Sequence, residues 1–193
     1  MRDSRTIFRL NAEANPGSRN AVSVLRAALK GSEAMTESKQ TLVAWLRDAH
    51  AMERANVDSL DRLADRLSRY PELGVRFREH WRESIGQVEH IEACLKKLGS
   101  DTSTFKDLTS RFIGIAQAYA VAVRPDEIVK DCLAAYAFMH FEIAAYLSLG
   151  AAALALEEPE ITRMCYEHLE RERAMASWLE QQIPEVTLEF LRP

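Results

Sequence analysis

The chain has 193 residues, of which 47% are hydrophobic and 28% are charged, and its formal net charge at pH 7 is -4. A chain of this length and composition can bury a core of its own, as one large domain or as a domain with an arm. The negative charge and the lack of any block of lysines or arginines argue against a nucleic-acid surface or an anionic-membrane anchor, which leaves small molecules, metal ions and proteins as partners.

The cysteine pattern and the N-terminal composition predict a cytoplasmic protein. Cys94, Cys132 and Cys165 lie far apart, form no Cys-x-x-Cys pair and fall at apolar helical positions. Reduced core cysteines are therefore expected. The first residues contain no apolar segment of the kind that a secretory signal peptide requires.

The sequence predicts three regions in the chain. Residues 1–19 are polar, are interrupted by Pro16 and Gly17, and are expected to form a flexible arm. Residues 20–35 predict a short amphipathic satellite helix that ends near Gly31. The main domain is expected to span residues 36–193.

Two long helices are predicted next. The first runs from Thr36, as its N-cap, to Arg69, and its apolar stripe is interrupted by Glu53. The second runs from Pro71 to Leu98 and ends at a glycine. Its core stripe is neighboured by a second row, one position earlier, which consists of His80, Glu83, Gln87 and His90.

The segment that follows is too long for a tight helical hairpin. Residues 100–104 are polar, and residues 105–123 form an amphipathic segment that ends before Pro125. Hairpin neighbours need only about 2–8 residues of loop. The length predicts a crossover from one end of a bundle to the other, carrying an extra helix.

Two further helices complete the prediction. The first lies between Pro125 and Glu158, and its stripe at helical spacing carries Glu142 where an apolar residue is expected. The second spans roughly Pro159 to Gln182 and carries Glu172 on its stripe. The remaining residues, 183–193, are apolar enough to pack against the domain.

The four glutamates have matched spacings. Glu53 and Glu83 are 30 residues apart, as are Glu142 and Glu172, and each predicted turn lies near the midpoint of its pair. Antiparallel hairpins would therefore bring the four carboxylates to one level of the core. Four buried carboxylates repel one another unless they are neutralised, and two divalent ions would balance their charge. Carboxylate oxygens suit iron or manganese, and Tyr146 could orient Glu142.

The set of predicted ligands extends beyond these glutamates. Ferritin-like dinuclear sites use Glu-x-x-His on two helices, but here the corresponding positions are Gly86 and Met175. Gln87, with His90, and His168 are the candidates to replace the missing histidines. A single glutamate on an apolar stripe more often reaches solvent than binds a metal, so the metal hypothesis depends on the four matched positions together. The predicted metal ligands are Glu53, Glu83, Glu142, Glu172, Gln87 and His168.

Four motifs resemble the YciF/YciE-like family of the ferritin-like superfamily. The family signature EHYEIAAY is similar to residues 139–146, and a helix ending followed by Pro-x-Val-Thr resembles residues 169–187. The first two helices match through Leu46, Asp48, Glu53, Glu83, Ser84 and Gln87. The likeness covers about residues 38–191. Departures from the family pattern include His50, Met139 and Arg171.

The resemblance implies a ferritin-like four-helix bundle, a dimer, a role in bacterial stress responses and a dinuclear metal site, without defining a reaction. The leading hypothesis is a metal-binding stress protein acting on peroxide or dioxygen. The alternative is a non-enzymatic interaction or scaffold bundle with a degenerate site. A homodimer is expected through the apolar outer face of the third helix, which could instead meet the extra helix. A membrane span by that helix is disfavoured, because Glu142 lies near its centre and the other helices would lose their apolar partner.

Overall fold

The computed structural model describes residues 23–24, 32–67, 70–100 and 127–192. Four long helices account for most of them: α3 (Ser32–Arg66), α4 (Pro71–Lys97), α6 (Glu127–Ala155) and α7 (Pro159–Phe190). No strand occurs among the described residues. The predicted arm, most of the satellite helix and the extra helix within 105–123 lie outside these ranges.

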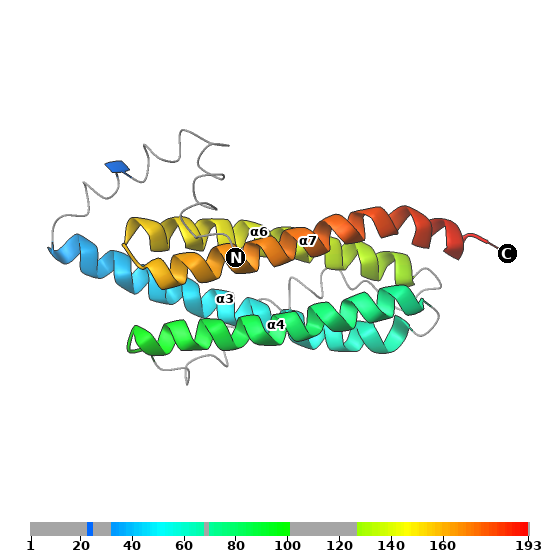
Figure 1. Ribbon diagram of the computed structural model, residues 1–193, viewed down its shortest axis with the longest axis horizontal. Helices are drawn as coiled ribbons and strands as arrows, with labels where there is room; N and C mark the ends of the chain where they lie inside the picture. The colour runs from blue at the N-terminus through cyan, green and yellow to red at the C-terminus, as the bar shows by residue number, and fades with distance from the viewer. Residues whose placement is uncertain (1–22, 25–31, 68–69, 101–126, 193) are drawn as a thin grey trace.

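The helices form two hairpins that pack as a bundle (Figure 1). α3 packs mainly against α4, and α6 packs mainly against α7, while α3–α6 and α4–α7 contacts join the two pairs. The C-terminal end of α4 and the start of α6 lie at opposite ends of the bundle (Figure 1). The predicted all-α four-helix architecture is therefore confirmed.

Two helices end in the same hydrogen-bonded motif. After α4, Ser100 N–H donates to the Leu95 carbonyl at 3.0 Å, and Gly99 has φ +69°. After α6, Glu158 N–H donates to the Ala153 carbonyl at 2.9 Å, and Glu157 has φ +59°. Both are Schellman ends, in which a left-handed residue satisfies the last helical carbonyls.

Two predicted helix boundaries are wrong. α3 begins at Ser32 rather than at Thr36. Glu33 in the first turn suits the positive end of the helix. α7 continues to Phe190 instead of ending near Gln182. Pro184 is tolerated because the carbonyl it leaves without a helical donor belongs to an exposed turn, while Val186 anchors the next turn in the core.

The apolar core is divided into two clusters. One contains Leu42, Leu46, Tyr146, Leu149 and Leu169 among its members. The other includes residues toward the opposite end of the bundle, among them Leu60, Phe77, Cys132, Met175 and Leu179. The buried glutamates of α3, α6 and α7 belong to neither apolar cluster. On α3 and α7 each glutamate separates in sequence the members of one cluster from those of the other, and on α6 Glu142 lies between Met139 of the second cluster and Tyr146 of the first.

α6 is a core helix of this bundle. Residues 128–155 are long and apolar enough to cross a membrane by length and composition. However, α6 packs against both α7 and α3, and its central glutamate is fully buried inside the protein. Packing against α3 and α7 accounts for part of its apolar composition, while Leu133, Phe141 and Leu147 remain exposed.

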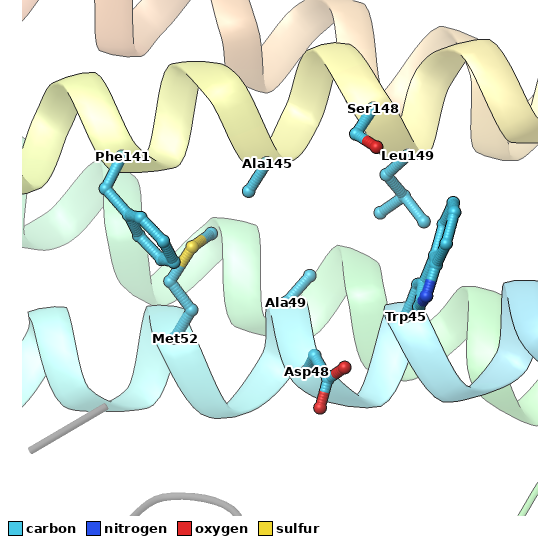
Figure 2. A pocket seen from close by; sticks show the side chains of 8 residues that line it. All are labelled: Trp45, Asp48, Ala49, Met52, Phe141, Ala145, Ser148 and Leu149. Carbon is cyan, nitrogen blue, oxygen red and sulfur yellow. The ribbon is translucent and has the colours of Figure 1, made fainter. Parts of the chain in front are cut away.

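A groove of about 220 Å³ runs between α3 and α6 (Figure 2). Trp45 and Met52 line it from α3, and Phe141, Ala145 and Leu149 line it from α6. Its walls are mostly apolar, and Phe141 and Trp45 are partly exposed. The expectation that this face of α6 meets another subunit or the extra helix stays a prediction.

Candidate metal centre

Three helices each bring one glutamate to the same place in the core. Glu53 of α3, Glu142 of α6 and Glu172 of α7 all have 0% of their surface exposed. Each replaces an apolar residue on the inward stripe of its helix, which is why the bundle buries it. Three of the four glutamates predicted from the sequence therefore meet.

Neutral side chains donate hydrogen bonds to one oxygen of each carboxylate. Gln87 Nε2 lies 3.2 Å from Glu53 Oε1 and 3.0 Å from Glu172 Oε1. Asn56 Nδ2 donates to Glu142 Oε1 at 2.9 Å. The Tyr146 hydroxyl donates to Glu53 Oε1. These bonds hold the three carboxylates in fixed orientations.

His80 of α4 completes the group. Its ring is fully buried, and its Nε2 lies 3.5 Å from Glu172 Oε2 without hydrogen-bond geometry. One ligand atom each from His80, Glu142 and Glu172 falls within a 4.8 Å cluster. Such a His/carboxylate set could hold a metal ion.

Glu83 does not join the buried carboxylates. Its side chain is 38% exposed, and its oxygens lie 3.4 Å from His80 Nδ1 and 3.7 Å from Arg76. The contact with His80, followed by the charges of Arg76 and Arg171, lowers the pKa of Glu83. The expectation that all four carboxylates meet at one level is corrected here. α4 turns His80, Ser84 and Gln87 inward, which leaves Glu83 at the flank.

Burial and neighbouring charges raise the pKa values of ionisable groups in this centre. Burial, followed by the charge of Glu172, raises the pKa of Glu53 well above its ordinary value. Burial, followed by the charges of Glu172 and Glu53, does the same for the pKa of Glu142. Burial also raises the pKa of Tyr146, so its hydroxyl stays protonated and donates. Without a cation, the folded chain therefore favours the protonated forms of Glu53 and Glu142.

Several buried polar atoms at this level have no hydrogen-bond partner among the described residues. They are Glu53 Oε2, Glu142 Oε2, Glu172 Oε2, His80 Nε2 and Gln87 Oε1. Atoms with lone pairs, gathered in a dry core and lacking donors, are what a metal ion would satisfy. The residues present therefore fit a bound metal.

His168 is buried but lies outside this group. Its Nε2 is 3.3 Å from His90 Nδ1, and its ring forms a T-shaped pair with Tyr146 at a centroid distance of 5.1 Å. Burial, together with Arg171 and His90, lowers the pKa of His168 to about 3. The structure therefore places this predicted ligand behind Tyr146, as a neutral imidazole, rather than among the carboxylates.

Comparison with known proteins identifies the family. Residues 37–192 match the family described as Domain of unknown function (DUF892). The chain belongs to this family. The resemblance to YciF-like proteins is thereby confirmed.

Solved structures of similar proteins share the fold. A protein from Xanthomonas campestris pv. campestris is 31% identical, with a TM-score of 0.68, over 80% of this chain and 96% of its own. The E. coli stress protein YciF is 22% identical, with a TM-score of 0.64, over 78% and 96% of the two chains. YcfI of Rhodopseudomonas palustris is 23% identical, with a TM-score of 0.62, over 74% and 92%.

Two residues of this DUF892 chain were missed as site candidates in the sequence. His80 lies three residues before Glu83, which reverses the Glu-x-x-His order of ferritin-like sites. Asn56 lies three residues after Glu53, so both project from one face of α3. In both cases the available signal was a polar residue one turn from a glutamate that the sequence predicts as a ligand.

Proposed function

We propose that this DUF892 chain is a metal-binding stress protein whose centre takes iron or manganese. The observation that carries the proposal is the buried group of His80, Glu142 and Glu172. Burying carboxylates without compensation costs several kcal/mol each, and a divalent ion would offset that cost. Oxygen ligands with one imidazole suit iron and manganese.

Glu83 has a role in this centre even though it faces outward. Its contact with His80 Nδ1 directs His80 Nε2 toward Glu172. A carboxylate that accepts from the far nitrogen of a metal-binding histidine fixes its tautomer and ring orientation. We therefore assign Glu83 to positioning His80 rather than to direct ligation.

Glu53 extends the centre. It shares the donor Gln87 with Glu172, and its second oxygen has no hydrogen-bond partner among the described residues. The structure supports one ion at His80, Glu142 and Glu172, and Glu53 would supply the additional carboxylate that a dinuclear centre needs. Tyr146 would hold Glu53 in place through its hydroxyl proton.

The stress role rests on the chemistry of the centre and on one relative. YciF, which shares the fold, is described as a stress protein. Iron or manganese bound by carboxylates would supply redox chemistry, with peroxide or dioxygen as the class of oxidant. The surrounding apolar clusters exclude bulk water from the bound ion.

Metal analysis tests the proposal directly. Protein purified without chelators, and reconstituted anaerobically with Fe²⁺ or Mn²⁺, should retain at least one equivalent of ion after gel filtration. The Glu142→Gln variant should retain less. Equal, substoichiometric metal in both proteins would refute the proposal.

A second candidate function has support of its own. Hydrogen bonds from Gln87, Asn56 and Tyr146 already occupy one oxygen of each carboxylate, and the chain lacks Glu-x-x-His at both expected positions. Such a network could persist with protonated carboxyls in a non-enzymatic interaction bundle. The two functions predict opposite effects of removing the glutamates, as described below.

A further inference from the structure

Tyr146 is an oxidisable side chain that is bonded directly to the carboxylate centre. It is fully buried, and its hydroxyl donates a hydrogen bond to Glu53 Oε1. Gln87 Nε2 lies 3.2 Å from that same oxygen and 3.0 Å from Glu172 Oε1. A short chain of hydrogen bonds thus joins the phenol to Glu172, one of the three residues of the ion-binding group.

A single bound iron ion supplies one electron fewer than the reduction of hydrogen peroxide to water requires. The described residues gather one ligand group, which consists of His80, Glu142 and Glu172. One ferrous ion held there supplies one electron, whereas hydrogen peroxide needs two electrons to become two molecules of water. Cleavage of peroxide by one electron alone releases a hydroxyl radical.

A hydroxyl radical released here would meet oxidisable residues of the core. Met139 lies three residues before Glu142, and Met175 lies three residues after Glu172, so each methionine is on the same helix face as a glutamate. Both methionines are buried, with 2% and 0% of their surface exposed. Oxidation of a buried methionine to its sulfoxide makes the side chain polar and disrupts packing. A second electron from a nearby group would complete the reduction before this damage occurs.

Tyr146 is positioned to give that electron together with a proton. A phenol that loses an electron becomes strongly acidic, and the existing hydrogen bond to Glu53 Oε1 provides an acceptor for its proton. Loss of both particles leaves a neutral phenoxyl radical, so no positive charge stays on the ring in the dry core. The ring of Tyr146 pairs with that of His168 at a centroid distance of 5.1 Å, and both side chains are fully buried. The radical is therefore shielded from solvent.

We propose that Tyr146 donates the second electron when the iron-loaded chain reduces hydrogen peroxide. This inference rests on the proposed function and adds a reacting residue to it. Peroxide takes one electron from Fe²⁺ and one from Tyr146. It also takes two protons, one from the Tyr146 hydroxyl through Glu53 and one from solvent. The O–O bond of peroxide and the O–H bond of Tyr146 break, and the products are two molecules of water, Fe³⁺ and the Tyr146 phenoxyl radical.

Electron paramagnetic resonance of the full chain tests the proposal. Protein loaded anaerobically with Fe²⁺ is passed through gel filtration, assayed for iron, mixed with one equivalent of hydrogen peroxide per bound iron and frozen. Wild type should give a phenoxyl radical signal, and ring-deuterated tyrosine should collapse its hyperfine splitting, which distinguishes tyrosine from tryptophan without any variant. At equal bound iron, Tyr146→Phe should lack the signal. Tyr136→Phe and Tyr166→Phe make the same substitution elsewhere on α6 and α7 and should keep it.

The iron assay separates failure of this inference from failure of the proposed function. A wild-type chain that retains iron but gives no tyrosyl signal overturns the role of Tyr146 and leaves metal binding intact. The same holds if the signal persists in Tyr146→Phe. A wild-type chain that retains no iron overturns both.

Mass spectrometry gives a second readout, which a purely structural role of Tyr146 would not change. After peroxide treatment at equal bound iron, Tyr146→Phe should contain more methionine sulfoxide at Met139 and Met175 than wild type. Iron-free samples of both proteins measure direct oxidation by peroxide and any loosening of the core, and this background is subtracted. Equal iron-dependent sulfoxide content in the two proteins would overturn the proposal.

Discussion

The two hairpins of the bundle share a sequence spacing but differ in what they bury. In the α6–α7 hairpin, Glu142 and Glu172 are both fully buried, whereas in the α3–α4 hairpin Glu53 is buried and the Glu83 side chain is 38% exposed. Both pairs are separated by 30 residues. Spacing across a hairpin sets the height of a side chain along the bundle. The direction in which it points depends on the rotation of its own helix.

The difference has a local cause in α4. Its buried residues include His80, Ser84, Gln87 and Ile91, which lie along one side of the helix. At about 100° per residue, Glu83 falls roughly a quarter-turn from that side. His80 takes the inward place, and Glu83 contacts it from the flank. One hairpin thus contributes two carboxylates to the centre, and the other contributes a carboxylate, an amide and an imidazole.

The largest expected effect comes from replacing both buried glutamates of the α6–α7 hairpin. With chelator present, Glu142→Leu/Glu172→Leu should raise the free energy of unfolding by about 1–4 kcal/mol, because apolar replacements of buried ionic groups are often stabilising. With metal at about 100 times its Kd, the wild type should gain about 2.7 kcal/mol that the variant lacks. Urea denaturation with and without metal measures both quantities.

The exposed Glu180→Leu provides the control for added hydrophobicity on α7. This variant should change the free energy of unfolding by the same amount with metal and with chelator. If the double variant behaves in the same way in both conditions, the interaction-bundle function is favoured instead.

The contribution of α4 can be resolved by comparing three substitutions. His80→Gln should weaken metal binding by at least about 10–100-fold, and Glu83→Leu by about tenfold, because loss of an orienting partner is costly. Glu83→Gln keeps an acceptor for His80 Nδ1 and should bind nearly as well as wild type. Isothermal titration with Mn²⁺ measures the affinities.

Glu79→Gln, one turn before Glu83 and exposed, is the matched control. Should Glu83→Gln cost as much as Glu142→Gln, then Glu83 is a direct ligand, as its sequence spacing predicts.

The stability of the metal-free chain is expected to depend on pH through Glu142. The pKa of Glu142 is raised in the folded state, so the folded chain binds more protons than the unfolded chain above about pH 4.3. Its contribution to stability is therefore present at low pH and is lost as pH rises through the folded pKa. The free energy of unfolding of the Glu142→Gln variant should therefore change less steeply with pH than that of the wild type, by up to about 1.4 kcal/mol per pH unit. Urea denaturation between about pH 5 and pH 8 with chelator tests this. Parallel curves for the two proteins would contradict it.

The smallest effect is expected on the flank of α4. Arg76→Gln removes ion pairs to Glu79 at 3.6 Å and Glu83 at 3.7 Å, both partly exposed. Exposed pairs of this kind contribute about 0–1 kcal/mol. Thermal denaturation should show a correspondingly small change, and a loss of several kcal/mol would place Glu83 within the core network after all.

Most of the fold could be predicted because its signals are local. Pro71 and Gly99 mark the two ends of α4, and the apolar stripes of α6 and α7 identify their buried faces. Glu142 and Glu172 lie on unambiguous stripes, so their burial followed from spacing alone. The prediction ends α7 near Gln182, but the helix continues through Pro184, whose cost depends on the solvent exposure of the turn before it, which spacing does not reveal.

The part of the site on α4 could not be predicted with the same certainty. Two adjoining rows of this helix both contain large or polar residues, so periodicity does not distinguish the inward row from the flank. Which row faces the core depends on how α4 packs against α3 and α7. His80 was therefore not selected, and Glu83 was expected to lie inward.

The turn between α6 and α7 sets the register of the two buried glutamates, and it uses Glu157 where the end of α4 uses a glycine. A left-handed backbone costs an ordinary L-residue about 1–2 kcal/mol. We therefore expect Glu157→Gly to stabilise the fold and to compensate for destabilising substitutions elsewhere in the chain. In that genetic background, damaging replacements in the interior could be studied in molecules that still fold.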